Sequence, residues 1–220
     1  MSDSASEPLP TLAEDLQLLL GRGGGELAHG YSDVAAAALV ELVILGRIGS
    51  QASHGFFANK GERKLFVTDS TPTGVPILDA ALSRVARSSR PWGVYRCVTK
   101  VQGRVSRLVV ERLIERGAIR SEGRPAGWKS KLQIADEAQH REAVFRRDTA
   151  YFAPEPVSSP RDAALVDLVR NANENFRIDD GTGPTTFRDW YPPELRDTIV
   201  AILEVEGVLT SAGGGGGYEG

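Results

Sequence analysis

A long apolar segment in the first quarter of the chain constrains the fold more than any other feature. Between Val34 and Leu45 every residue except Glu41 is alanine, valine, leucine or isoleucine. A helix without a polar face is buried on most of its sides, so this segment predicts a helix inside a globular core.

The rest of the chain carries start and stop signals for further helices. Thr11 precedes Glu14 at the spacing of a capping box, and the leucines that follow it lie on one helical stripe. Pro76 suits the first position of another helix. The other predicted helices span Val101–Arg116, begin at Ser159–Pro160, and run from near Pro192–Glu194 to a stop at Gly207.

The predicted β structure is small. Residues 118–121 and 128–134 flank a turn made of residues 123–127 (GRPAG), which indicates a β-hairpin. Lys64–Thr68 is short, β-branched and aromatic, which is typical of a strand or an extended edge.

These elements predict a mainly α protein, a single globular multi-helix domain with one β-hairpin. We expect the domain to span residues 11–210, after a flexible N-terminus at 1–10. The glycine-rich residues 211–220 cannot bury surface and are predicted to be a disordered tail.

Charge and cysteine usage exclude several kinds of partner. The formal net charge is -3 and the pI is near 5.7, so no global basic field draws the chain to nucleic acid, and we expect no nucleic-acid partner. Cys97 is the single cysteine. It excludes an intramolecular disulfide and a thiolate metal cluster, and we expect it to fill a small apolar space.

We expect a cytoplasmic protein. No stretch approaches the roughly 20 apolar residues that a membrane-spanning helix needs, and Met1–Pro10 is acidic and polar, unlike a secretory signal. The many alanines, glycines and arginines indicate a GC-rich coding sequence, so we expect a bacterial source.

The residues that catalysis would need are not arranged for it. His29, His54 and His140 lack metal-ligand spacing, and no Gly-x-Ser-x-Gly motif presents a nucleophile. Residues 21–25 (GRGGG) follow a helix and read as a loop, and Asp179–Asp180 reads as a solvated turn. We therefore predict a protein that is not an enzyme and needs neither a cofactor nor a metal ion.

Three cations share one side of a predicted helix. Lys100, Arg104 and Arg107 recur at intervals of four and three residues, and three cations on one stripe can hold a phosphate. The alternative is a solvated face on which Arg107 pairs with Glu111 one turn later.

Three motifs together resemble the Golgi phosphoprotein 3 family. They are residues 39–48 (LVELVILGRI), 69–82 (DSTPTGVPILDAAL) and 113–119 (LIERGAI), and the order of elements matches from Leu12 to Leu209. The resemblance implies a mainly helical, non-enzymatic, peripheral membrane protein that binds the headgroup of phosphatidylinositol 4-phosphate or another anionic lipid.

The resemblance also implies which residues bind the headgroup. In the family, two arginines three residues apart precede the third motif, and with a one-residue gap Arg104 and Arg107 match them, with Lys100 on the same stripe. The family pocket also uses a tryptophan and an arginine, and ungapped counting puts Glu26 and Ala35 at these two positions. Alanine cannot replace the donor fork of arginine, so this departure concerns lipid specificity more than fold.

The family hairpin that corresponds to residues 119–134 mediates self-association and touches the membrane. By resemblance we expect protein partners or a homo-oligomer through this hairpin. Trp128 lies beside Lys129 and is the predicted membrane contact, because an amphipathic ring suits the headgroup layer. The alternative is that Trp128 packs onto the core.

Two other functions fit parts of the sequence. A helix end followed by glycine and a hydrophobic residue recurs at Gly46, Gly117 and Gly207, a device that winged-helix domains also use. The alternative function is therefore a winged-helix-like nucleic-acid or protein interaction module. A scaffold for the cytoplasmic tails of other proteins, as in eukaryotic family members, is the third hypothesis.

Overall fold

The computed structural model describes residues 9–53, 63–122, 130–152, 159–172 and 188–213. In these ranges the chain forms seven α-helices, one short 3-10 helix at Arg188–Trp190 (η1) and seven short strands. The mainly α class and the single globular domain predicted from the sequence are confirmed.

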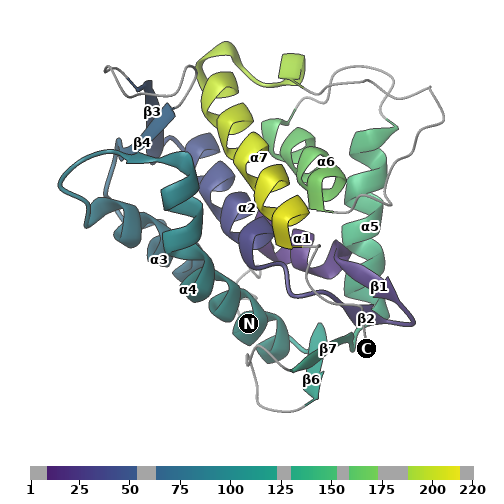
Figure 1. Ribbon diagram of the computed structural model, residues 1–220. Helices are drawn as coiled ribbons and strands as arrows, with labels where there is room; N and C mark the ends of the chain where they lie inside the picture. The colour runs from purple at the N-terminus through teal and green to yellow at the C-terminus, as the bar shows by residue number, and fades with distance from the viewer. Residues whose placement is uncertain (1–8, 54–62, 123–129, 153–158, 173–187, 214–220) are drawn as a thin grey trace, which may run out of the picture.

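Helix α2 (Tyr31–Ile44) occupies the centre of the domain, as its apolar composition predicts (Figure 1). Its residues from Val34 to Val43 are all buried. The helices that pack against it are α1 (Leu12–Leu19), α3 (Pro76–Ala86), α4 (Val94–Glu115), α6 (Pro160–Ala172) and α7 (Pro193–Gly213). In Figure 1, α3 and α4 lie on one side of α2, while α6 and α5 (Glu137–Tyr151) lie on the other.

Two small antiparallel sheets flank the helices. The predicted hairpin is confirmed as β6 (Ile119–Glu122) paired with β7 (Lys131–Ile134). The sequence did not indicate that β1 (Gly21–Gly23) and β2 (Glu26–Leu27) extend this hairpin to a sheet of order β1-β2-β7-β6. Gly24 and Gly25, at φ of 59° and 79°, form the turn between β1 and β2, so a segment predicted as a loop is a tight hairpin.

The second sheet has the order β3-β4-β5 and is formed by Ile48–Ala52, Arg63–Val67 and Trp92–Gly93. The predicted strand at Lys64–Thr68 is confirmed as β4, which pairs on one edge with β3 and on the other with β5. Through β5, this sheet is joined directly to the first residue of α4, Val94.

Two of the three glycines predicted to end helices do so. Gly46 and Gly117 each have φ of 69°, and the residue after each donates its N–H back to the helix, Arg47 to Leu42 and Ala118 to Leu113. The prediction for Gly207 is wrong, because α7 continues to Gly213. Val205 and Leu209, one turn apart, both pack on the core, and this contact outweighs the cost of glycine inside a helix, about 1 kcal/mol.

Two helices differ from the sequence prediction in extent. Helix α4 begins at Val94, well before the predicted Val101, because Val94 and Val98 continue its buried stripe. Helix α5 was not predicted. It buries only Ala143, Ala150 and Tyr151, so it shows no apolar periodicity, and Asp136 caps its N-terminus by accepting from the N–H of Ala138 at 2.8 Å.

The conspicuous motif at 69–82 has a structural role. Asp69 accepts a hydrogen bond from the N–H of Thr71 at 2.8 Å and pairs with Arg47, which lies just after α2. Asp79, on the first turn of α3, accepts from the N–H and the hydroxyl of Thr73, at 2.6 and 2.8 Å. These contacts fix the entry into α3, and they occupy the Asp79 carboxylate.

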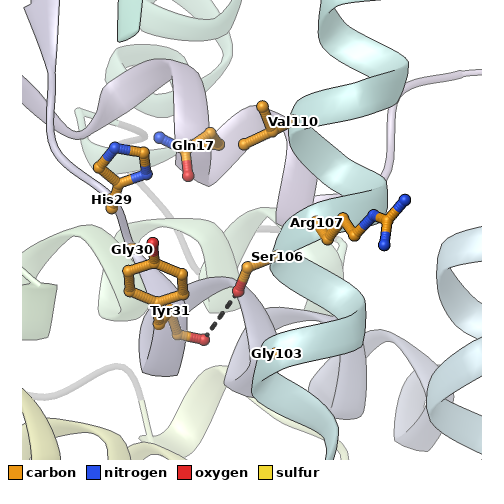
Figure 2. A pocket seen from close by; sticks show the side chains of 8 residues that line it. All are labelled: Gln17, His29, Gly30, Tyr31, Gly103, Ser106, Arg107 and Val110. Carbon is orange, nitrogen blue, oxygen red and sulfur yellow. Dashed lines mark hydrogen bonds between the residues drawn. The ribbon is translucent and has the colours of Figure 1, made fainter. Parts of the chain in front are cut away.

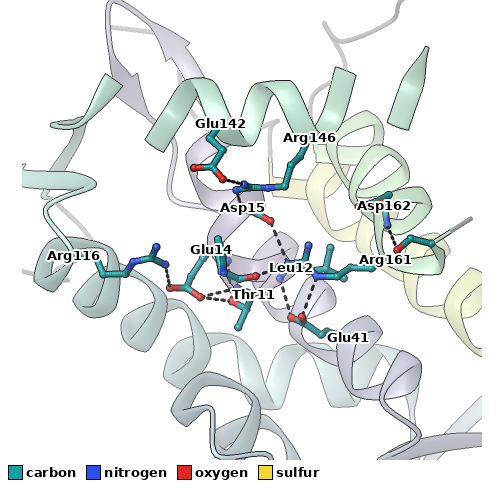
Figure 3. Close-up of polar contacts among 12 residues, drawn as sticks. Thr11, Leu12, Glu14, Asp15, Glu41, Arg116, Glu142, Arg146, Arg161 and Asp162 are labelled. Atoms are coloured by element: carbon teal, nitrogen blue, oxygen red, sulfur yellow. Dashed lines mark hydrogen bonds and ion pairs between the residues drawn. The ribbon is translucent and has the colours of Figure 1, made fainter. Parts of the chain in front are cut away.

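Buried acids on α1 bind arginines from three other helices (Figure 3). Glu14 has no exposed side-chain surface, and its Oε1 lies 2.9 Å from Arg112 Nε and 3.4 Å from Arg116 Nη1 of the α4 C-terminal region. Its Oε2 accepts from the N–H of Thr11 at 2.8 Å, which completes the predicted capping box. We call the whole set of contacts to Glu14, Asp15 and Glu41 the α1 ion-pair network.

The second half of the network joins α1 and α2 to α5 and α6. Asp15 Oδ1 lies 2.6 Å from Arg146 Nη2, and its Oδ2 lies 3.2 Å from Arg161 Nη2. Arg161 also reaches Glu41 Oε1 at 3.3 Å, so the one charged residue of the apolar α2 segment has a partner. Burial raises the pKa of Asp15, and the hydrogen bond and charge of Arg146 oppose that rise. The network is therefore a set of desolvated charges that depend on one another.

Candidate functional site

Helix α4 presents the three predicted cations to solvent. Its opposite side buries Val101, Val105 and Val109 in the core, as the sequence periodicity requires. Lys100, Arg104 and Arg107 are all exposed. The side chains that surround Arg107 differ from those that surround Lys100 and Arg104.

The structure divides the three cations between two hollows. Lys100 and Arg104 line an open groove of about 760 Å³ between α3 and α4, which we call the α3–α4 groove. Arg107 lines a separate hollow on the other side of α4, beside the start of α2. The single stripe seen in the sequence is therefore the ridge between two different surfaces.

The α3–α4 groove has a second basic wall. Arg84 and Arg87 of α3 face it together with Lys100 and Arg104, and Pro76 and Leu108 give it an apolar part. None of the four cations forms an ion pair with any residue in the described ranges. Asp79 is the one acid lining the groove, and the turn at Thr73 already engages its carboxylate.

Arg84 and Arg87 were not predicted as site residues, although the distribution of charge along the sequence indicates them. The 31 residues from Ala80 to Val110 contain seven lysines and arginines and no aspartate or glutamate. A run of one sign across two helices and their connection marks a local basic surface even in an acidic protein. The spacing of cations along one helix does not show which cations a neighbouring helix adds, and here α3 adds Arg84 and Arg87.

Trp92 of β5 lies beside the same wall. The guanidinium of Arg84 is 5.7 Å from the centre of the Trp92 ring, and that of Arg96 is 5.2 Å from it. Such cation–π contacts restrict a long side chain without neutralising its charge. Arg84 is therefore held at the groove while its donors remain available.

The hollow beside Arg107 is much smaller, about 40 Å³, and we call it the Tyr31 pocket (Figure 2). Its lining residues are Gln17, His29, Gly30, Tyr31, Gly103, Ser106, Arg107 and Val110. The rings of His29 and Tyr31 stack with their centres 5.5 Å apart, and Ser106 donates its hydroxyl to the Tyr31 carbonyl at 3.2 Å. The volume suits a few water molecules.

Arg107 itself is paired. Its Nε lies 2.7 Å from Glu111 Oε1, one turn further along α4, so the alternative weighed from the sequence describes this side chain. An exposed pair at this spacing contributes little to stability, so an anion could displace it.

Ala35 and Glu26, the two positions that depart from the family pattern, both lie away from the two hollows. Ala35 has no exposed surface and lies within the α2 core, where an arginine would be buried without solvent. Glu26 lies in β2, opposite Gln133 of β7. Neither Ala35 nor Glu26 lines either hollow in the described chain, whereas Tyr31 does.

The remaining sequence predictions concern chemistry and membranes. Trp128, the predicted membrane contact, lies outside the described residues. Burial raises the pKa of Cys97 to about 12, so its thiol is not a nucleophile at neutral pH, in keeping with a core role. Among the described residues no group of histidines, cysteines and acids has a metal-binding arrangement, and no helix is both long and apolar enough to cross a bilayer.

Comparison with known proteins adds one finding. A family model described as Golgi phosphoprotein 3 (GPP34) matches residues 12–202, most of the chain. The matched region runs from the first residue of α1 into α7 and includes both hollows on α4. No curated protein matches the chain.

Proposed function

The chain belongs to the Golgi phosphoprotein 3 family, and on that basis we propose that it is a non-enzymatic protein that binds an anionic phospholipid headgroup at a membrane surface. Phosphatidylinositol 4-phosphate, or a lipid like it, is the proposed ligand, and Lys100, Arg104 and Arg107 are its proposed contacts. The observation that supports this most is that Lys100 and Arg104 are exposed, one turn apart, and have no acidic partner in the described chain.

The chemistry of these groups suits a phosphate. Arg104 offers a planar fork of donors that matches two phosphate oxygens, and Lys100 adds a compact positive charge. Because the site is open to water, each contact is partly screened by salt and the affinity of one copy is modest. Stable attachment then needs a second signal, for which we propose Trp128 at the bilayer surface or self-association through the hairpin at 119–134.

The direct test is co-sedimentation of the full chain with vesicles. Separate vesicle preparations would contain phosphatidylinositol 4-phosphate, phosphatidylinositol, phosphatidylglycerol or neutral lipid only, each at two salt concentrations. We expect selective pelleting with phosphatidylinositol 4-phosphate that weakens as salt rises. Absence of pelleting with every anionic vesicle would contradict the proposal and favour a protein partner.

A double variant tests the residues. Arg104→Ala with Arg107→Ala should abolish vesicle binding while leaving the unfolding free energy nearly unchanged, because both side chains are exposed. The matched control is Arg90→Ala with Arg141→Ala, which removes two exposed arginines that line neither hollow. A folded Arg104/Arg107 variant that pellets like the wild type would show that the site is elsewhere.

A further inference from the structure

The α3–α4 groove has cations on both walls, and we propose that it binds a headgroup-sized ligand carrying two or more phosphate groups. The inference rests on the proposed function in sharing Lys100 and Arg104, and it goes beyond that function by placing the ligand between α3 and α4, in a groove that Arg107 does not line. It also assigns a binding role to Arg84 and Arg87, which come from a different helix.

Charge balance sets the number of phosphates. Four cations line the groove, and the single acid among the lining residues, Asp79, is held by the turn at Thr73. The hydrogen bonds from Thr73 leave the Asp79 carboxylate its charge, so four cations and one acid give the groove lining a net charge of +3. One phosphate monoester carries about -1.5 to -2 charges at neutral pH and leaves about one of these positive charges uncompensated. A second phosphate group compensates the remaining charge, and complementary charge raises the association rate and the specificity.

Size and shape place the bisphosphate ligand in this groove and not in the Tyr31 pocket. A volume of about 760 Å³ lies in the range of small-molecule sites, whereas the Tyr31 pocket holds about 40 Å³. Pro76 and Leu108 provide apolar surface on which a ring can rest while its phosphates reach the two walls. The α3 wall is anchored by the packing of α3 against α4 and α2.

Trp92 acts as a positioning residue for this wall. Its ring contacts Arg84 from one helix and Arg96 from another, so it limits where the Arg84 guanidinium can go. A side chain restrained before binding loses less freedom when the ligand arrives.

The test uses isothermal titration of the full chain with inositol 1,4-bisphosphate and, separately, with inorganic phosphate. We expect the bisphosphate to bind more tightly. Arg84→Ala with Arg87→Ala should weaken bisphosphate binding at least about tenfold, because each lost charged hydrogen bond is a large fraction of the affinity. The matched control, Arg90→Ala with Arg141→Ala, removes the same charge from two exposed arginines outside the groove and should change affinity less than about threefold.

Two results would overturn the inference. One is an Arg84/Arg87 variant that binds the bisphosphate as tightly as the wild type. The other is a control variant that loses as much affinity as the groove variant, since that would reveal a diffuse field and no site. Trp92→Phe should retain most of the affinity and Trp92→Leu should lose several-fold, because only an aromatic ring restrains Arg84; equal losses would remove the positioning role.

A competition experiment with vesicles distinguishes a lipid headgroup from a soluble phosphate as the ligand. It also distinguishes failure of the groove inference from failure of the proposed lipid binding. If vesicles with phosphatidylinositol 4-phosphate compete with the soluble bisphosphate, and the Arg84/Arg87 variant loses both, the ligand is a lipid headgroup in the groove. If the bisphosphate binds but no vesicle does, the groove stands and lipid binding fails. If vesicles bind through Arg104 and Arg107 while Arg84/Arg87 substitution changes nothing, lipid binding stands and the groove inference fails.

Discussion

The two sides of α2 use the same residue type for opposite purposes. On the α1 side, Arg146 and Arg161 reach buried carboxylates at 2.6 to 3.3 Å. On the α3 and α4 side, Arg84, Arg87 and Arg104 have no ion pair within the described chain. An arginine thus holds helices together where a buried acid faces it, and keeps its donors open to solvent where none does.

The difference has a simple origin in the positions of the acids. The acids at 14, 15 and 41 lie on helices that the core surrounds, so folding forces them to find cations. The run from Ala80 to Val110 contains no acid, so it brings no carboxylate to the cations of the α3–α4 groove. The absence of aspartate and glutamate over a long run therefore marks a basic surface better than the number of its cations does.

The largest expected effect comes from breaking the paired side. Arg161→Ala removes a partner from both Asp15 and Glu41 and leaves two desolvated carboxylates with fewer cations. We expect the unfolding free energy to fall by about 2–4 kcal/mol, measured by denaturant titration. The matched change on the open side, Arg87→Ala, should alter it by no more than about 0.5 kcal/mol, because that side chain is exposed and unpaired. Equal losses for the two variants would erase the distinction between the two sides.

A buried acid with a weaker partner set sharpens the comparison within the paired side. Asp167 of α6 accepts from the Tyr191 hydroxyl at 2.7 Å, and its closest arginine contact is 4.0 Å away, at Arg170. Burial raises the pKa of Asp167 to about 6. Because the folded state holds this proton more tightly than the unfolded chain, stability should fall as pH rises from about 4 to about 6, by up to about 3 kcal/mol.

Asp167→Asn isolates that effect. The amide oxygen can still accept from Tyr191, but the side chain no longer titrates. Unfolding free energies of both proteins at pH 4.5, 5.5, 6.5 and 7.5 should differ most at the highest pH, with the variant more stable there. A difference that stays constant across these pH values would mean that Asp167 ionises without cost in the folded protein. Asp15 and Glu41, whose pKa values burial also raises, are common to both proteins and cancel in the difference.

Local signals predicted most of the fold. Each of these signals acts on residues close to it in the sequence, so a short window of sequence contains it. They are the apolar run of α2, the capping box at Thr11, the proline at the start of α3 and the glycines after α2 and α4. Helix α5 escaped prediction because long-range ion pairs such as Arg146 to Asp15 hold it, and no apolar stripe announces them.

The site could be predicted only in part for the same reason. The spacing of Lys100, Arg104 and Arg107 correctly placed them on the exposed side of one helix. Their separation into two hollows depends on α3 packing against one flank of α4 and the start of α2 lying against the other, which the spacing cannot express. The motifs at 39–48 and 69–82, which identify the family, hold the entry into α3 and touch the groove only through its α3 wall.

The smallest expected effect concerns Arg107, the cation of the stripe that shares features of both sides. It is exposed like its neighbours but paired with Glu111 like an arginine of the network. Glu111→Gln should leave the unfolding free energy nearly unchanged, since an exposed pair contributes little. It should also strengthen binding to vesicles with phosphatidylinositol 4-phosphate by about two- to threefold, because Arg107 no longer has to leave a partner.

Glu115→Gln is the matched control, an exposed glutamate one turn further along α4 that makes no ion pair in the described chain. If both variants strengthen binding equally, the gain comes from net charge alone; if the Glu111→Gln gain survives in the Arg107→Ala background, Arg107 is not a contact, and the lipid site is confined to the α3 side of the helix.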